Sequence, residues 1–160
     1  MKKIFQLTVA VLAGCALAGC SHDETTETTG PVITLHEPEE NQPFTAGNAH
    51  GVHLEFDLAD ESGLNQYKID IHYGEGHTHS QALQAQPQAA RADWSYQKTY
   101  EDAKGLKNHH VHVHSDSIPE NASLGAYHLG IWATDIHGNE SVVYRTFTVV
   151  DYPVEDDDED

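Results

Sequence analysis

The histidines of residues 108–117 are the side chains in this sequence whose type and spacing could do chemistry. His110, His112 and His114 alternate with Val111 and Val113, and side chains two apart on a β-strand point to the same face. The pattern predicts a strand with valines toward a core and imidazoles on the other face. Successive imidazoles would lie roughly 6.5 to 7 Å apart, so two of them can bind one metal ion with a further ligand from elsewhere.

Three further histidines are candidate ligands for the same ion. His77 and His79 lie in the loop after a predicted strand at 64–73, and His128 begins another predicted strand at 127–134. In an antiparallel sandwich these strand ends and the end of the histidine strand lie at one end of the domain. We therefore predict a metal site drawn from six histidines, namely His77, His79, His110, His112, His114 and His128.

The ligand type limits the choice of metal. Imidazole ligands without thiolates suit Zn(II), Cu(II), Ni(II) or Fe(II), and we expect zinc first and copper next. Because only neutral imidazole binds a metal ion, affinity should fall below about pH 6.5. The pattern fits one site or two.

The strands that must position these histidines alternate apolar and polar residues. In the segment 51–58, His53, Glu55 and Asp57 lie opposite the apolar side chains. Short strands at regular spacing, with no helical periodicity after residue 20, predict an all-β fold and an antiparallel β-sandwich of about seven strands. The predicted strands are 32–35, 51–58, 64–73, 94–100, 108–117, 127–134 and 142–149.

The start of the chain is similar to a bacterial lipoprotein signal. A positively charged beginning precedes an apolar segment at 4–18 that is too short to span a bilayer. Leu17-Ala18-Gly19-Cys20 resembles the lipobox, and the same pattern ends at Cys15. We favour Cys20 as the lipidated residue, because cleavage at Cys15 would shorten the apolar segment. Both cysteines then belong to the leader, and the domain is expected to lack a disulfide.

Composition divides the chain and restricts its partners. The formal charge of −18 argues against nucleic acid and anionic lipid and favours attraction of cations. Ser21 and the acidic residues after it resemble signals that send lipoproteins to the outer membrane and the cell surface. We predict a signal peptide at 1–19, a polar tether at 20–30, a β-sandwich at 31–150 and an acidic disordered tail at 151–160.

Four segments of the second half resemble a known family. Ile118-Pro-Glu-Asn-Ala, Gly125-Ala-Tyr-His-Leu, Ala133-Thr-Asp and Gly138-Asn-Glu-Ser are similar to the later strands of immunoglobulin-like bacterial surface domains. Together with the lipobox and the histidines, residues 30–150 resemble the histidine-rich bacteroidete lipoproteins grouped as domain of unknown function 4625. The resemblance implies an immunoglobulin-like fold and an outer-membrane address, and no activity comes with it.

Three functions follow as expectations. The first is a lipid-anchored, non-enzymatic protein that captures zinc or a similar transition metal at the outer membrane and passes it to a transporter there. The second is a metalloenzyme, because copper and zinc oxidoreductases can be built on β-sandwiches with His-x-His strands. Against it, the chain lacks the disulfide and the glycine-flanked motif of the familiar dismutases, and no carboxylate and histidine stand at catalytic spacing. The third is an adhesion or accessory module whose histidines have no metal role.

Overall fold

The computed structural model describes residues 28–74 and 90–154. Within these ranges the chain is all β, as predicted, and no helix that could cross a membrane is found there. The strands are β1 (Val32–Glu37), β2 (Pro43–Thr45), β3 (His53–Ala59), β4 (Leu64–Tyr73), β5 (Ser95–Tyr100), β6 (Asn108–His114), β7 (Gly125–Asp135) and β8 (Glu140–Val150).

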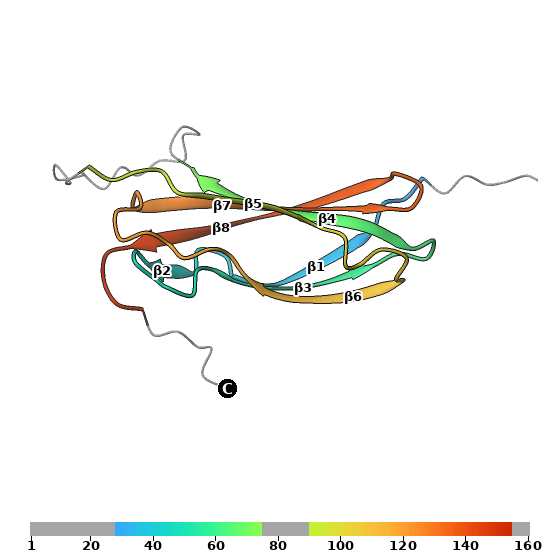
Figure 1. Cartoon of the computed structure of the whole chain (residues 1–160), viewed down its shortest axis with the longest axis horizontal. Helices are drawn as coiled ribbons and strands as arrows, with labels where there is room; N and C mark the ends of the chain where they lie inside the picture. Colours follow the sequence, from blue (N-terminus) through green and yellow to red (C-terminus); the bar gives the residue numbers. More distant parts are fainter. Residues whose placement is uncertain (1–27, 75–89, 155–160) are drawn as a thin grey trace, which may run out of the picture.

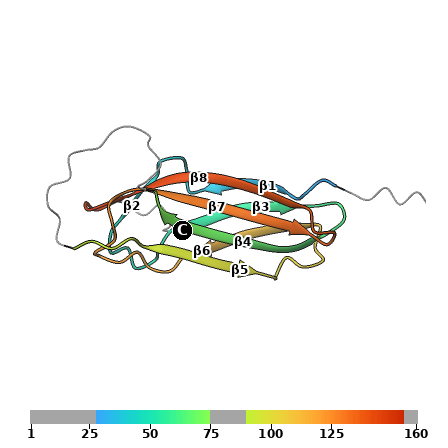
Figure 2. The same ribbon diagram turned by 90° about the horizontal axis from the view of Figure 1, so that it is seen from above.

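The strands form two sheets that pack face to face. One sheet has the order β1-β3-β6 and the other the order β2-β8-β7-β4-β5. In Figure 1, β1, β3 and β6 make the lower layer, and β4, β5, β7 and β8 make the upper layer. Figure 2 shows that the strands of both layers run along the long axis of the molecule, which is the aligned packing of a β-sandwich. The predicted sandwich is confirmed.

One strand in the described residues was not predicted. β2 is three residues long and runs parallel to β8, from Pro43 opposite Thr148 to Thr45 opposite Val150. A segment this short shows no alternation, so its pairing depends on β8 and leaves no pattern of its own. The other seven strands lie where the alternation predicted them.

The core lies between the sheets and contains the apolar side of each strand. On β3, Leu54, Phe56 and Leu58 are buried, and the residues between them are partly exposed. On β6, Val111 is buried while the alternate histidines stay on the outside. The predicted division of both strands into a core face and an outer polar face is confirmed.

A buried tyrosine connects the start of β7 to the loop before it. Tyr127 is fully buried, and its hydroxyl donates a hydrogen bond of 2.9 Å to the carbonyl oxygen of Ser123. Its ring stacks on Phe147, with centroids 5.6 Å apart, and contacts Trp94 at 5.8 Å. This is the tyrosine corner found in immunoglobulin-like sandwiches.

The turn between β7 and β8 is held by one buried carboxylate. Asp135 accepts hydrogen bonds from the backbone N–H groups of His137 and Asn139, both at 2.8 Å, and from the Asn139 side chain at 2.7 Å. Burial alone would raise the pKa of Asp135, but these hydrogen bonds hold it below its ordinary value. Asp135 pairs with Leu64 at the start of β4, so His137 lies at the far end of the sandwich from His53 and His114.

Candidate metal centre

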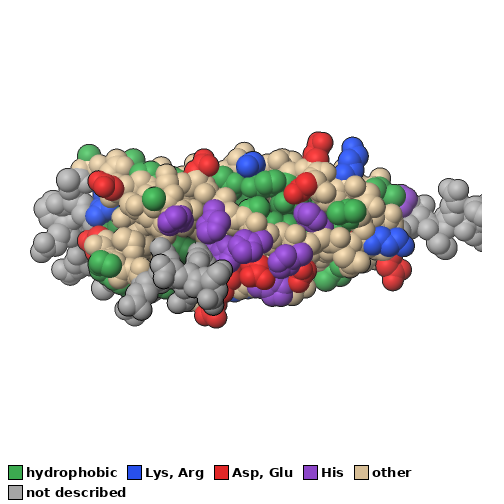
Figure 3. Space-filling model, turned by 60° about the horizontal axis from the view of Figure 1, so that its bottom comes forward, with side chains coloured by type: hydrophobic (Ala, Val, Ile, Leu, Met, Phe, Trp, Pro, Cys, Tyr) green, Lys and Arg blue, Asp and Glu red, His purple; other side chains and the backbone are tan. Residues whose placement is uncertain are grey.

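The pairing of β3 with β6 determines which polar side chains meet on the outer face of the three-stranded sheet. Each outward residue of β3 faces an outward histidine of β6, because both strands turn their alternate residues to the core. Figure 3 shows histidine side chains gathered on this side of the molecule, with acidic side chains beside them. The facing pairs are His53 with His114, Glu55 with His112 and Asp57 with His110.

Three histidines converge at one end of this face, and we call them the three-histidine cluster. One ring nitrogen from each of His53, His112 and His114 lies within 4.8 Å of the other two. The ring of His53 is 4.6 Å from that of His112 and 5.1 Å from that of His114, centroid to centroid. The rings of His112 and His114 are 6.3 Å apart, close to the spacing that the strand rise predicts.

The geometry of the cluster suits a tetrahedral ion after small side-chain movements. Zinc–nitrogen bonds of 2.0 to 2.1 Å place two tetrahedral ligand atoms about 3.3 Å apart. The nitrogens of the cluster would therefore have to approach one another by about 1.5 Å at most. His112 and His114 are exposed, and His53 is half-buried, so rotations of the two exposed rings can supply this movement. The backbone positions of all three are set by paired strands.

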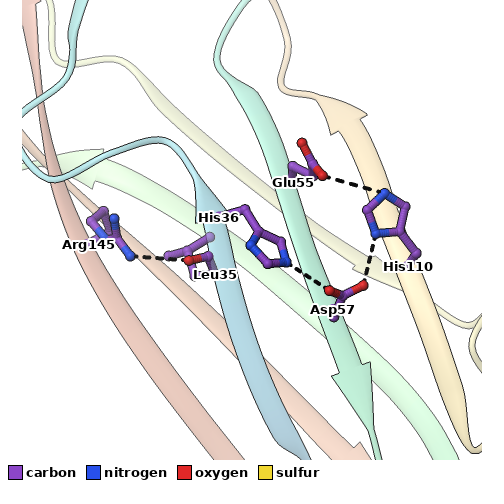
Figure 4. Close-up of polar contacts among 6 residues, drawn as sticks. All are labelled: Leu35, His36, Glu55, Asp57, His110 and Arg145. Atoms are coloured by element: carbon purple, nitrogen blue, oxygen red, sulfur yellow. Dashed lines mark hydrogen bonds and ion pairs between the residues drawn. The ribbon is translucent and has the colours of Figure 1, made fainter.

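A second group of polar side chains crosses the same face, and we call it the Asp57 network. His36 Nε2 lies 2.8 Å from Asp57 Oδ2, and His110 Nδ1 lies 2.9 Å from Asp57 Oδ1. The other ring nitrogen of His110, Nε2, lies 3.7 Å from Glu55 Oε1 (Figure 4). The hydrogen bond from His36, and after it the one from His110, holds the pKa of the Asp57 carboxyl below its ordinary value.

The histidine of β1 in this network is fixed from the other sheet. Arg145 of β8 donates hydrogen bonds to the carbonyl oxygens of Pro38 (3.1 Å) and Leu35 (3.4 Å). Leu35 precedes His36 directly, and Figure 4 shows Arg145 approaching β1 from the side away from Asp57. The arginine therefore holds the end of β1 where His36 reaches across to β3.

His128 lies on the opposite outer face of the sandwich. It pairs with His72 in the five-stranded sheet, and the two rings are 5.8 Å apart. The His128 ring covers Gly74, where an added Cβ would come within 2.6 Å of its Nε2. His72 in turn contacts the Asp70 carboxylate at 3.0 Å. The strand ends share one end of the domain, as expected, but the core separates His128 from His112 and His114.

The six predicted ligands therefore do not form one set. His112 and His114 come together, His110 belongs to the Asp57 network, and His128 is on the other sheet. This corrects the expectation that the histidines of the domain end meet at one site, because a sandwich has two outer faces. His77 and His79 lie in residues 75–89, outside the described residues. Cys20 and the predicted tether up to residue 27 lie outside them too.

Several residues of this face were not among the predicted ligands. His53 completes the three-histidine cluster, and His36, Glu55 and Asp57 make up most of the second group. The alternation in 51–58 already placed three of the four on one strand face. The sequence pattern did not show that β3 lies beside β6, because the alternation within one segment does not indicate which other strand pairs with it.

Comparison with known proteins gives one family. The family model described as Domain of unknown function (DUF4625) matches residues 18–150. This range covers most of the chain and contains every strand of both sheets. No curated protein matches the chain.

Proposed function

This chain belongs to the family Domain of unknown function (DUF4625), and from that premise we propose that it binds a transition-metal ion through His53, His112 and His114. The family description names no activity, so the proposal depends on the site. The observation that carries it is the convergence of three imidazole nitrogens within 4.8 Å, supplied by two adjacent strands.

The ligand set suits several transition metals, among which we propose zinc first and copper next. Three imidazoles without thiolates suit Zn(II) and Cu(II), with Ni(II) and Fe(II) as further candidates. Because the paired strands already hold the backbone in place, closing on an ion costs side-chain freedom but little backbone freedom. The formal charge of −18 raises the local concentration of cations near the protein.

The proposal includes attachment to the outer membrane through Cys20. Its support is the lipobox-like segment 17–20 and the acidic residues that follow it. A metal ion captured by an anchored protein would be held close to an outer-membrane transporter that could accept it. The protein then acts as a non-enzymatic metal-capture lipoprotein.

Removing two of the three ligands should raise the Kd for the first equivalent of zinc at least tenfold, a loss of about 1.4 kcal/mol of binding free energy. The variant is His112→Ala with His114→Ala, and the measurement is isothermal titration calorimetry on untagged protein freed of metal with a chelator. Both side chains are exposed, so the variant should keep its fold, which circular dichroism checks. His53→Ala is expected to give a comparable loss.

The matched control is His137→Ala, in the β7–β8 turn at the far end of the sandwich. It removes one imidazole without touching the cluster and should leave zinc affinity unchanged. If it weakens binding as much as the His112 and His114 pair does, the histidines act as independent surface groups and the proposal fails. His77→Ala with His79→Ala tests whether the loop adds a ligand, as the sequence predicts.

Zinc should also stabilise the folded protein. An ion that binds the native state alone adds about 2.7 kcal/mol to the free energy of unfolding when its concentration is a hundredfold above Kd. We expect a higher Tm in thermal unfolding with zinc, reversed by a chelator. A Tm that saturating zinc, copper and nickel all leave unchanged would rule out a native-state site.

A further inference from the structure

Glu55 and His110 are diagonal neighbours across the β3–β6 pair, and their side chains approach each other at a distance longer than a hydrogen bond. His110 Nε2 and Glu55 Oε1 are 3.7 Å apart, whereas an N–H···O hydrogen bond spans about 2.7 to 3.2 Å. Two ligand atoms bonded to one zinc ion at 2.0 to 2.1 Å lie about 3.3 to 3.4 Å apart at the tetrahedral angle, so the two side chains would have to approach each other by about 0.3 to 0.4 Å. The gap fits an ion pair when the His110 ring is protonated and, after this small movement, a shared metal ion when the ring is neutral.

The hydrogen bonds of the Asp57 network indicate which nitrogen of His110 is the ligand. An ionised carboxylate can only accept hydrogen bonds, so the 2.9 Å contact requires His110 Nδ1 to carry a proton. In the neutral ring Nε2 then carries a lone pair, and it faces the acceptor oxygen of Glu55. Two acceptors pointing at one another are stabilised by a cation between them. A carboxylate that fixes the tautomer of a histidine is the usual support of a histidine metal ligand.

Asp57 is itself held on both sides. Its second oxygen, Oδ2, accepts a hydrogen bond of 2.8 Å from His36 Nε2, and Arg145 fixes the carbonyl of the preceding Leu35. The support for His110 therefore extends across β1, β3 and β6 to the second sheet (Figure 4). The ligands remain open to solvent, because the His110 and Glu55 side chains are 55% and 35% exposed.

We propose that Glu55 and His110 form a second metal site for a divalent transition-metal ion, with Asp57 as the positioning residue. The site adjoins the three-histidine cluster, since Glu55 faces His112 across the strand pair, but shares no ligand with it. This inference deepens the proposed function and rests on it for the class of ion. One imidazole and one carboxylate suit Zn(II) and similar borderline ions. With two protein ligands and water in the other positions, the second ion binds more weakly than the first.

The test is the stoichiometry of zinc binding to the untagged full-length protein, measured by calorimetry. The wild type is expected to bind two equivalents, the second at least tenfold more weakly than the first. Glu55→Gln keeps the shape of the side chain and removes its charge. It should raise the Kd of the second zinc equivalent at least tenfold and change the Kd of the first by less than twofold. His110→Ala should do the same. Glu61→Gln, an exposed carboxylate in the turn before β4, changes the net charge equally and should leave both equivalents unchanged.

The role of Asp57 has its own spectroscopic readout. In the wild type, the ¹⁵N chemical shifts of the His110 ring should report a proton on Nδ1 and none on Nε2. In Asp57→Asn, the His110 ring should lose this tautomer preference. Binding of the second zinc equivalent should weaken, and binding of the first should remain unchanged. If the shifts show no tautomer preference in the wild type, Asp57 does not position the ligand.

The failures of the two proposals can be told apart with His114→Ala, which removes the cluster ligand two positions beyond His112. Suppose that the wild type binds a single equivalent of zinc, and that His114→Ala weakens this binding whereas Glu55→Gln does not. The second site is then refuted and the first stands. If Glu55→Gln abolishes the binding of one zinc equivalent and His114→Ala abolishes none, the second site stands and the three-histidine cluster is refuted as a metal site. If neither variant changes binding, both proposals are refuted.

Discussion

Cys20→Ala is expected to move the protein completely from the membrane fraction to the soluble fraction. The thiol of Cys20 is the proposed point of lipid attachment, and alanine has no nucleophile to receive the lipid. Each buried methylene of an acyl chain contributes about 0.8 kcal/mol to membrane binding, so losing two or more chains removes the whole anchor. Fractionation of cells grown with a labelled fatty acid measures both attachment and location.

Cys15→Ala is the matched control, because Cys15 ends a segment of the same pattern as the one that ends at Cys20. It should leave both the lipid label and the membrane location intact. Lipid-labelled, membrane-bound Cys20→Ala protein would show that attachment occurs elsewhere, and Cys15 would be the next candidate. Metal binding by the soluble Cys20→Ala protein should equal that of the wild type, since the cluster lies on β3 and β6.

Tyr127→Ala is expected to destabilise the domain by about 4 kcal/mol, the cost of deleting a large buried aromatic side chain. The ring is fully buried against Phe147 and Trp94, so its removal leaves a cavity between the sheets. It also deletes the hydroxyl that bonds to the Ser123 carbonyl. Urea unfolding followed by tryptophan fluorescence measures the change in the free energy of unfolding.

Tyr127→Phe separates the hydrogen bond from the packing. It keeps the ring and removes only the hydroxyl, so we expect a loss of about 1 to 1.5 kcal/mol. A phenylalanine variant as unstable as the alanine variant would mean that the corner bond, and not the ring, dominates. An alanine variant that loses less than about 2 kcal/mol would mean that the core closes over the cavity.

The two proposed metal sites differ in how strongly the fold prepares them. In the three-histidine cluster the strands place three rings side by side, and small rotations complete the ligand set. In the Asp57 network hydrogen bonds already orient His110 before any ion arrives. We therefore expect substitutions of Asp57 to affect ligand orientation, and substitutions in the cluster to affect the number of ligands.

The alternation of residue types was sufficient to predict much of the fold. In 51–58 and 108–114, apolar residues at every second position identify the strands and divide their side chains between core and surface. Seven of the strands, the β-sandwich and the outward direction of His110, His112 and His114 follow from this pattern. These properties are local, because a strand turns successive side chains to opposite faces wherever it lies.

The composition of the candidate sites depended on which strands become neighbours and in what register. His53 meets His114, and Asp57 meets His110, only because β3 pairs with β6 at that register. His128 has the same residue type and lies at the same end of the domain, but β7 belongs to the other sheet. Strand order and register arise from packing between segments far apart in the sequence, where the burial of the whole core selects one arrangement. The sequence by itself therefore determined the faces of the strands, and the tertiary structure decided which faces meet.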